Sequence, residues 1–179
     1  MDKKTGVYIC TGCGIGDALD IEALSKVATK ESKVPVCKTH AFFCGEEGVA
    51  QIKSDIANEG VNTVVIAGCS SRVNYDVFDF GPSIILERAN LREQVIWCHP
   101  EDDEDTQMMA EDNLRMSLAK AAHIDIPEGY RVENMVKTIL VVGGGLTGIT
   151  AALEGAKAGY KTVLVEKNPV LGGLDEQLI

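Results

Sequence analysis

Cysteine is the residue type with the most chemistry to offer in this sequence. The 179 residues contain six cysteines, and the N-terminal segment shows no apolar stretch with a cleavage site, so we expect no secretory signal. Because disulfides are rare in the reducing cytosol, this count favours metal binding or redox chemistry over disulfide bonds. Some of the six can still be core residues, since a free cysteine packs as a small hydrophobe.

Four of the cysteines lie close to the ends of predicted strands. Cys10 ends the first strand, and Cys13 lies in the glycine-rich loop that follows it. Cys44 precedes a helix, and Cys69 follows the most apolar strand. In a parallel sheet these positions fall along the carboxyl edge, where open α/β sheets bind their ligands. Four thiolates could converge there on an iron–sulfur cluster, and the loop glycines would let backbone N–H groups approach the sulfurs.

Three other interpretations of these cysteines stay open. The same four thiolates could hold zinc tetrahedrally, because a four-cysteine set alone does not separate zinc from an iron–sulfur cluster. The Cys10-x-x-Cys13 pair could act as a redox dithiol, or all four could be core residues without a metal. Cys98, which the pattern places at the end of another strand, is a reserve ligand for Cys10. Arg72 lies close to Cys69 in the sequence and could donate to a cluster sulfur or face the solvent.

A second motif lies near the C-terminal end of the sequence. Gly143, Gly145 and Gly148 form the pattern G-x-G-x-x-G between an apolar strand and an alanine-rich helix, and Glu166 ends the next strand. In dinucleotide-binding folds such glycines permit a tight turn, close approach of the pyrophosphate and close helix–strand packing. The helix N-terminus binds the phosphates, and the carboxylate binds the ribose diol. Because a carboxylate would repel a 2′-phosphate, NADP is disfavoured; a glycine-rich turn without a ligand is the alternative.

A resemblance decides between FAD and NAD. Residues 166–173 (EKNPVLGG) resemble the segment after the ribose carboxylate in flavoproteins with two dinucleotide folds, which implies FAD. Only one βαβ unit of such a domain is present in the sequence. We therefore expect the FAD-binding domain to be incomplete here, and FAD affinity of this chain alone to be weak or absent.

The elements that position these residues alternate between strands and helices. Runs of apolar, β-branched residues predict strands at residues 6–10, 34–37, 61–67, 94–98, 138–142 and 161–166. Helical spacing of apolar residues predicts helices at 21–30, 46–59, 75–89, 105–123 and 146–159, the third of them interrupted by Gly81-Pro82. Such alternation predicts an α/β fold with a mostly parallel sheet and right-handed crossovers. Trp97 and the pair Met108 and Met109 are predicted to lie in the core.

The sequence predicts two domains. Residues 1–123 form a cysteine-rich, Rossmann-like α/β domain that would carry the iron–sulfur site. Residues 124–136 contain Pro127 and Gly129, lack any periodicity and are predicted to be a linker. Residues 137–179 are the first βαβ unit of an FAD-binding domain that is truncated in this sequence.

Composition excludes several classes of partner. The formal net charge is −10 at pH 7, which argues against nucleic acid and anionic membranes, because both attract clustered Lys and Arg. The longest uncharged run, residues 138–153, is short for a membrane span and contains three consecutive glycines. We therefore expect no membrane insertion and a cytoplasmic location.

Four segments, followed by the glycine loop, resemble a known family. They are residues 7–14 (VYICTGCG), 43–44 (FC), 65–72 (VIAGCSSR) and 89–99 (ANLREQVIWCH). Together they resemble the A-subunit family of heterodisulfide reductase and the similar flavoprotein, the B subunit, of the quinone-interacting membrane-bound oxidoreductase complex. The resemblance covers essentially the whole chain. The sequence has Cys-x-x-Cys-Gly where the family usually has Cys-x-Cys-Gly, and Ser71 where the family usually has proline.

The resemblance implies an electron-transfer subunit of an anaerobic oxidoreductase complex. By position, Cys10, Cys13, Cys44 and Cys69 match the family's cysteines and would hold one [4Fe-4S] cluster, which exchanges electrons with FAD. The implied partners are other redox subunits of a multi-subunit complex, and the 179-residue chain alone is expected to be inactive. The alternatives are a zinc-stabilised interaction domain of a flavoenzyme, or a thiol–disulfide oxidoreductase that uses Cys10 and Cys13.

Overall fold

The computed structural model describes residues 2–173. The chain forms two compact units, which divide between Glu128 and Gly129. The predicted linker at residues 124–136 lies across this division and contains turns but no helix or strand. Among the described residues, no helix combines the length and apolar composition that crossing a membrane requires.

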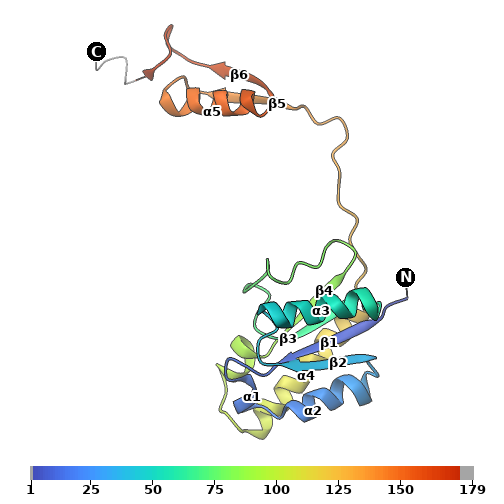
Figure 1. Ribbon diagram of the computed structural model, residues 1–179. Coiled ribbons are helices and arrows are strands. Elements are labelled where there is room, and N and C mark those ends of the chain that lie inside the picture. Colours follow the sequence, from blue (N-terminus) through green and yellow to red (C-terminus); the bar gives the residue numbers. More distant parts are fainter. Residues whose placement is uncertain (1, 174–179) are drawn as a thin grey trace. The chain divides into compact units, whose positions relative to one another are not determined.

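A four-stranded parallel sheet forms the centre of the first unit (Figure 1). Its strands are β1 (Thr5–Cys10), β2 (Val36–His40), β3 (Thr63–Gly68) and β4 (Ile85–Asn90). They lie in the order β2-β1-β3-β4, and every neighbouring pair is parallel. The prediction of an α/β fold with a mostly parallel sheet is therefore confirmed.

Helices cover both faces of this sheet (Figure 1). They are α1 (Ile15–Ala18), α2 (Ile21–Lys26), which continues into the π-helix η1 (Val27–Glu31), α3 (Glu46–Asn58), the π-helix η2 (Arg92–Ile96) and α4 (Glu104–His123). Helix α3 packs on one face of the sheet, and α2 and α4 pack on the other. Asp20 is the N-cap of α2, since its carboxylate accepts the N–H of Ala23 at 3.0 Å, which satisfies one of the open donors of the first turn.

The core follows from the alternation of side chains along the two central strands. Val65 and Ala67 of β3 belong to the apolar cluster on the α2 and α4 side, whereas Val64 and Ile66 belong to the cluster under α3. All six residues of β3 are buried, as expected for a strand covered on both faces. The strand therefore holds its C-terminal end, and the residue after it, in a fixed place.

Lys3 ties the start of the first unit to its last helix. Its Nζ donates to the carbonyl oxygens of Ala121 at 3.3 Å, Ala122 at 2.8 Å and Ile124 at 2.6 Å. These carbonyls lie at the end of α4, where the helix has no N–H groups left to satisfy them. A cation is also favoured there by the helix dipole. Lys3 thus serves as a C-terminal cap supplied from far away in the sequence.

Two predicted elements are wrong. Residues 75–84 form turns and irregular chain instead of a helix, and β4 begins at Ile85. Proline cannot continue a helix, and Gly81 has a φ of 90°, so the segment breaks at Gly81-Pro82. The strand predicted at residues 94–98 is the π-helix η2, in which the N–H of Ile96 reaches the carbonyl of Leu91 at 3.0 Å.

Three residues predicted to lie in the core are exposed. The exposed fractions are 65% for Trp97, 54% for Met108 and 37% for Met109. Trp97 follows η2, and the two methionines lie on the outer side of α4, whose buried face is carried by residues such as Ala110 and Leu114. Large apolar side chains alone therefore do not identify the inward faces of these elements.

The second unit consists of one strand–helix–strand segment. It contains β5 (Thr138–Val142), α5 (Leu146–Lys157) and β6 (Lys161–Val165), and the two strands pair in parallel with Thr138 opposite Lys161. Gly155 lets α5 approach the sheet, because a Cβ there would lie 3.1 Å from Ile139. The apolar side chains at alternate strand positions remain exposed: Leu140, Val142, Val163 and Val165.

Candidate functional site

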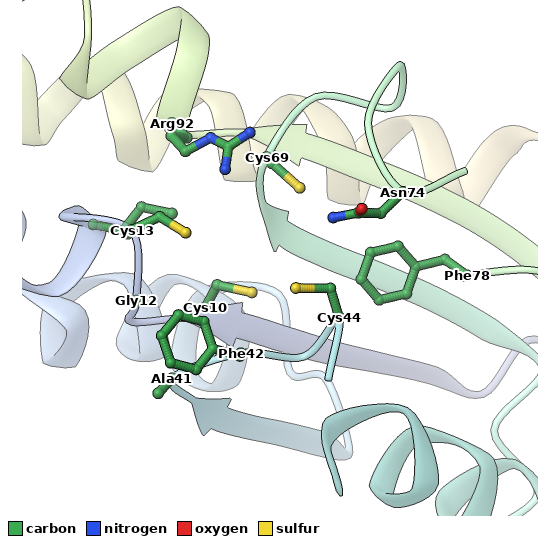
Figure 2. Close-up of a pocket in the computed structure, with 11 residues that line it drawn as sticks. Cys10, Gly12, Cys13, Ala41, Phe42, Cys44, Cys69, Asn74, Phe78 and Arg92 are labelled. Atoms are coloured by element: carbon green, nitrogen blue, oxygen red, sulfur yellow. The ribbon is translucent and has the colours of Figure 1, made fainter. Parts of the chain in front are cut away.

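The carboxyl ends of β1, β2 and β3 surround a pocket that four cysteines line. Cys10 ends β1, Cys13 lies in the next loop, Cys44 connects β2 to α3, and Cys69 directly follows β3. Figure 2 shows that their side chains point into the same space, from the end of β1 and from the loops that follow β1, β2 and β3. The sequence prediction named these four cysteines as ligands, and the structure brings them together.

The other two cysteines lie outside this pocket. Cys37 is half-buried against the core on the α2 side. Cys98 is exposed, and its thiol donates to the carbonyl of Glu93 at 3.1 Å. Because residues 92–96 form a π-helix, Cys98 does not end a strand, and it is not among the residues that line the cysteine pocket. The structure therefore gives no support to Cys98 as a reserve ligand.

The strand order explains why a pocket forms here. The two neighbours of β1 are β2 on one side and β3 on the other, so the connections leave β1 and β3 in opposite directions. Open α/β sheets bind ligands at such a switch point. Gly68, the last residue of β3, leaves room for the thiol of Cys10, because a Cβ at Gly68 would lie 3.1 Å from its Sγ.

Glycines also shape the loop that carries Cys13. A Cβ at Gly12 would lie 2.3 Å from the carbonyl oxygen of Ala41, and one at Gly16 would lie 2.7 Å from that of Thr11. The N–H of Gly12 bonds to Ala41 at 2.9 Å, which fixes the loop against the end of β2. Cys13 itself has a φ of 56°, a conformation that is uncommon for a residue with a side chain and is often found at functional sites.

Burial and mutual repulsion act together on the Cys10 thiol. Burial raises the pKa of Cys10 to about 11, and a hydrogen bond with the backbone of Phe43 partly offsets this. The neighbouring Cys69 and Cys44 raise the pKa further, since two thiolates so close would repel each other. A reactive dithiol needs a lowered thiol pKa, whereas a bound metal displaces the proton itself.

Two arginines, neither of which was identified from the sequence, adjoin these thiols. Arg92 lines the pocket (Figure 2), and its pKa is raised mainly by a hydrogen bond with Glu93 and also by one with Cys13. Arg88 donates from Nη2 to Sγ of Cys69 at 2.8 Å. Arg72, the arginine that the sequence suggested, is exposed. The sequence offered one signal for Arg88, which is a charged residue close behind the apolar residues 84–86. The helix predicted over residues 75–89 concealed its position in a strand.

The donor set suits an iron–sulfur cluster, because four cysteines line one pocket and such clusters are held by cysteine thiolates. Among residues 2–173, no three His, Cys, Asp or Glu side chains are placed to hold a single metal ion. Tetrahedral zinc, with Zn–S bonds of about 2.3 Å, requires sulfurs about 3.8 Å apart. A [4Fe-4S] cluster instead takes one thiolate on each of its irons, so its four ligands lie further apart. Four cysteine thiols that line one pocket supply the number and type of ligands that such a cluster takes.

The glycine loop of the second unit has the geometry that a dinucleotide requires. Gly143 has a φ of 104°, and a Cβ at Gly148 would lie 1.8 Å from the carbonyl oxygen of Gly143. Gly145 begins α5, so the first N–H groups of the helix adjoin the loop. Both Gly143 and Gly148 are therefore needed for the shape of the turn, and the helix N-terminus is available to phosphate.

Glu166 lies beside this loop. One carboxylate oxygen accepts the N–H of Asn168 at 2.9 Å, and the other accepts that of Gly144 at 2.5 Å. These hydrogen bonds, Asn168 first, lower the pKa of Glu166, so the carboxylate stays charged near neutral pH. The predicted ribose-binding residue and the predicted phosphate loop are thus in direct contact.

The segment after Glu166 returns to the same loop. The N–H of Gly172 donates to the carbonyl of Gly144 at 2.8 Å, and Gly172 forms a parallel bridge with Gly145. Gly173 approaches closely as well, since a Cβ there would lie 3.2 Å from Cα of Gly145. The glycine pair that resembles a flavoprotein sequence therefore packs on the predicted nucleotide-binding turn.

Comparison with known proteins gives matches for both units. The family described as FAD dependent oxidoreductase matches residues 138–175. The chain is 39% identical to the A subunit of H(2):CoB-CoM heterodisulfide,ferredoxin reductase from Methanothermobacter thermautotrophicus, over 99% of the chain and 28% of that protein. It is 38% identical to a protein from Archaeoglobus profundus described as similar to the A subunit of heterodisulfide reductase, over 96% of the chain and 25% of that protein. It is 33% identical to the A subunit of ferredoxin:CoB-CoM heterodisulfide reductase from Methanosarcina mazei, over 95% and 22%. The chain thus spans about a quarter of the length of these relatives.

Proposed function

Since the chain matches the N-terminal part of heterodisulfide reductase A subunits, we propose that it is the electron-transfer region of such an oxidoreductase subunit. In this proposal, electrons pass between a [4Fe-4S] cluster in the first unit and FAD in the second. The convergence of Cys10, Cys13, Cys44 and Cys69 in one pocket is the observation that carries the proposal.

The residues of the pocket would bind and stabilise the cluster. The four cysteines supply one thiolate for each iron, and Gly12, Gly16 and Gly68 leave the space that these side chains need. Arg92 stands at the pocket with its guanidinium paired to Glu93 at 2.7 Å. Its positive charge would offset part of the negative charge of four thiolates and a cluster.

The residues of the second unit would bind the nucleotide part of FAD. Gly143, Gly145 and Gly148 shape the phosphate-binding turn, and Glu166 would accept hydrogen bonds from the ribose diol. The family match at residues 138–175 supports FAD over NAD. When bound, FAD and the cluster supply complementary chemistry, since a flavin exchanges two electrons and an iron–sulfur cluster carries one.

The names of the relatives suggest the setting. Each is an A subunit, or a protein similar to one, so the partners in this proposal are other redox subunits of a multi-subunit complex. All six cysteines are free, and thiols stay reduced in the cytoplasm, which is where the proposal places the protein.

Anaerobic reconstitution with iron and sulfide tests the cluster. Wild-type protein should turn brown and hold about four irons and four sulfides per chain. Single changes to serine at Cys10, Cys13, Cys44 and Cys69 should each reduce the iron content, whereas Cys37→Ser and Cys98→Ser serve as matched controls that should retain it. Colourless protein with stoichiometric zinc, or iron loss only in the control variants, would refute the assignment.

A further inference from the structure

Arg88 is an unusual residue for its place in the fold. It lies in β4, opposite Ile66 of β3 in the parallel register. Ile66 belongs to the apolar cluster under α3, and Leu86, two residues before Arg88, packs against that same cluster. An arginine at this position brings a permanent charge to an apolar face, because its guanidinium does not deprotonate in proteins.

The guanidinium holds the loop that follows β3. Its Nη2 donates to the carbonyl oxygens of Cys69 at 3.0 Å and Ser70 at 3.2 Å, and its Nη1 donates to that of Val73 at 3.3 Å. Its plane lies over the ring of Phe78, 4.4 Å from the centroid. The planar guanidinium spreads these donors over two nitrogens and lies flat on the ring at the same time, a combination that the compact ammonium group of a lysine does not offer.

The same guanidinium contacts the thiol of Cys69. Nη2 lies 2.8 Å from Sγ of Cys69, which lines the cysteine pocket. No carboxylate among residues 2–173 forms an ion pair with Arg88, and its Nε is buried without a hydrogen-bond partner there. Arg88 is half-buried, and a charge that is partly removed from water is costly unless an opposite charge compensates it. The nearest candidate for that opposite charge is a thiolate at Cys69.

We propose that Arg88 is a positioning residue for the cluster: it fixes the Cys69 loop and donates a charged hydrogen bond to Sγ of Cys69 that raises the reduction potential. The inference rests on the proposed function. Reduction adds negative charge to the cluster, so a cation bonded to a ligand sulfur stabilises the reduced form more than the oxidised form. Hydrogen bonds to sulfur and net charge are two of the factors that set cluster potentials.

Two measurements on the 179-residue chain test this inference, with Arg88→Met and Arg88→Lys compared with Arg72→Met. Arg72 is the matched control, because it is an exposed arginine in the loop that follows Cys69. The first measurement is amide hydrogen exchange of residues 70–74 in metal-free protein. Arg88→Met should speed this exchange at least tenfold, Arg88→Lys should not restore it, and Arg72→Met should leave it within twofold.

The second measurement is the potential of the iron-loaded protein. Arg88→Met should lower the equilibrium constant for one-electron reduction about tenfold, which is 59 mV. Arg88→Lys, which keeps the charge, should recover part of this change and remains informative if Arg88→Met does not fold. A merely structural arginine would alter exchange without moving the potential, and that result would overturn the inference.

The outcomes also separate this inference from the proposed function. Wild-type protein that binds no iron would overturn both together. Wild-type protein that binds the cluster, with Arg88 variants matching Arg72→Met in exchange and in potential, would overturn the role of Arg88 alone.

Discussion

A methyl group added at Gly68 should disturb the cysteine pocket more than it disturbs the sheet. The added Cβ would lie 3.1 Å from Sγ and 3.2 Å from Cβ of Cys10. Non-bonded carbon atoms prefer a separation of about 3.5–4.0 Å, so the Cys10 side chain would have to move by about half an ångström. Because Gly68 lies in a buried strand, the added methyl group cannot move into solvent.

The expected magnitude follows from two opposing effects. Overpacking of a well-filled core costs about 1–3 kcal/mol, whereas replacing glycine by alanine restricts the unfolded chain and returns about 0.4–1 kcal/mol. The net effect is the overpacking cost less this gain. We therefore expect Gly68→Ala to lower the free energy of unfolding by about 1 kcal/mol. Metal sites tolerate displacements of only about 0.5 Å, so iron content should fall more sharply than stability.

Urea unfolding of metal-free protein and iron analysis after anaerobic loading measure the two effects. Gly129→Ala is the control, because nothing lies within 4 Å of a Cβ at Gly129. Combining Gly68→Ala with Cys10→Ala removes the Sγ contact and should recover part of the lost stability. If Gly68→Ala holds as much iron as wild type, or if the double variant shows no coupling between the two sites, the reasoning about this contact is wrong.

Three further predictions concern other parts of the chain. Asp55→Ala should lower the free energy of unfolding by about 1–3 kcal/mol, because the buried hydroxyl of Tyr8 loses its acceptor at 3.1 Å. Urea unfolding measures this change. A value below about 0.5 kcal/mol, the usual range for surface substitutions, would contradict the prediction. Gly148→Ala should abolish the loop conformation, since its Cβ would meet a carbonyl oxygen at 1.8 Å; amide chemical shifts of residues 143–148 should all change, and unchanged shifts would disprove the argument. Because the pKa of Glu166 is lowered in the folded protein, the hydrogen bond from Gly144 to its carboxylate is present above the unfolded pKa of about 4.3. This hydrogen bond is lost as the pH falls through the lower pKa of the folded state. The amide chemical shift of Gly144 should follow this titration in wild type and should not follow it in Glu166→Gln.

Periodic, locally determined features were predictable from the sequence. The strand at residues 138–142 was predicted with the bounds that β5 has, because five apolar or β-branched residues lie between clear turn signals. The apolar run at residues 61–67 likewise identified β3, the central buried strand. The convergence of the four cysteines also follows from local sequence, once parallel strands place their carboxyl ends at one edge.

The features that the sequence did not reveal depend on distant contacts. Residues 85–90 form a strand because they pair with β3, and this pairing outweighs a helical spacing that continues across Gly81-Pro82. Residues 94–98 were predicted to form a strand, but the hydrogen bonds of Ile96 and Trp97 run back to Leu91 and Arg92 in the preceding turn. Arg88 was missed for the same reason, since its contact with Cys69 spans 19 residues and depends on the pairing of β4.

The cap that Lys3 places on α4 has a consequence for how the cysteine-bearing unit can be reused. A hydrogen bond from Nζ of Lys3 to the carbonyl of Ile124 joins residues 3 and 124, so β1 is entered close to where α4 is left. Domains whose ends adjoin tolerate circular permutation and insertion into other chains. We therefore expect that this unit can be inserted into a surface loop of another protein, or circularly permuted, while the strands that present its four cysteines stay together.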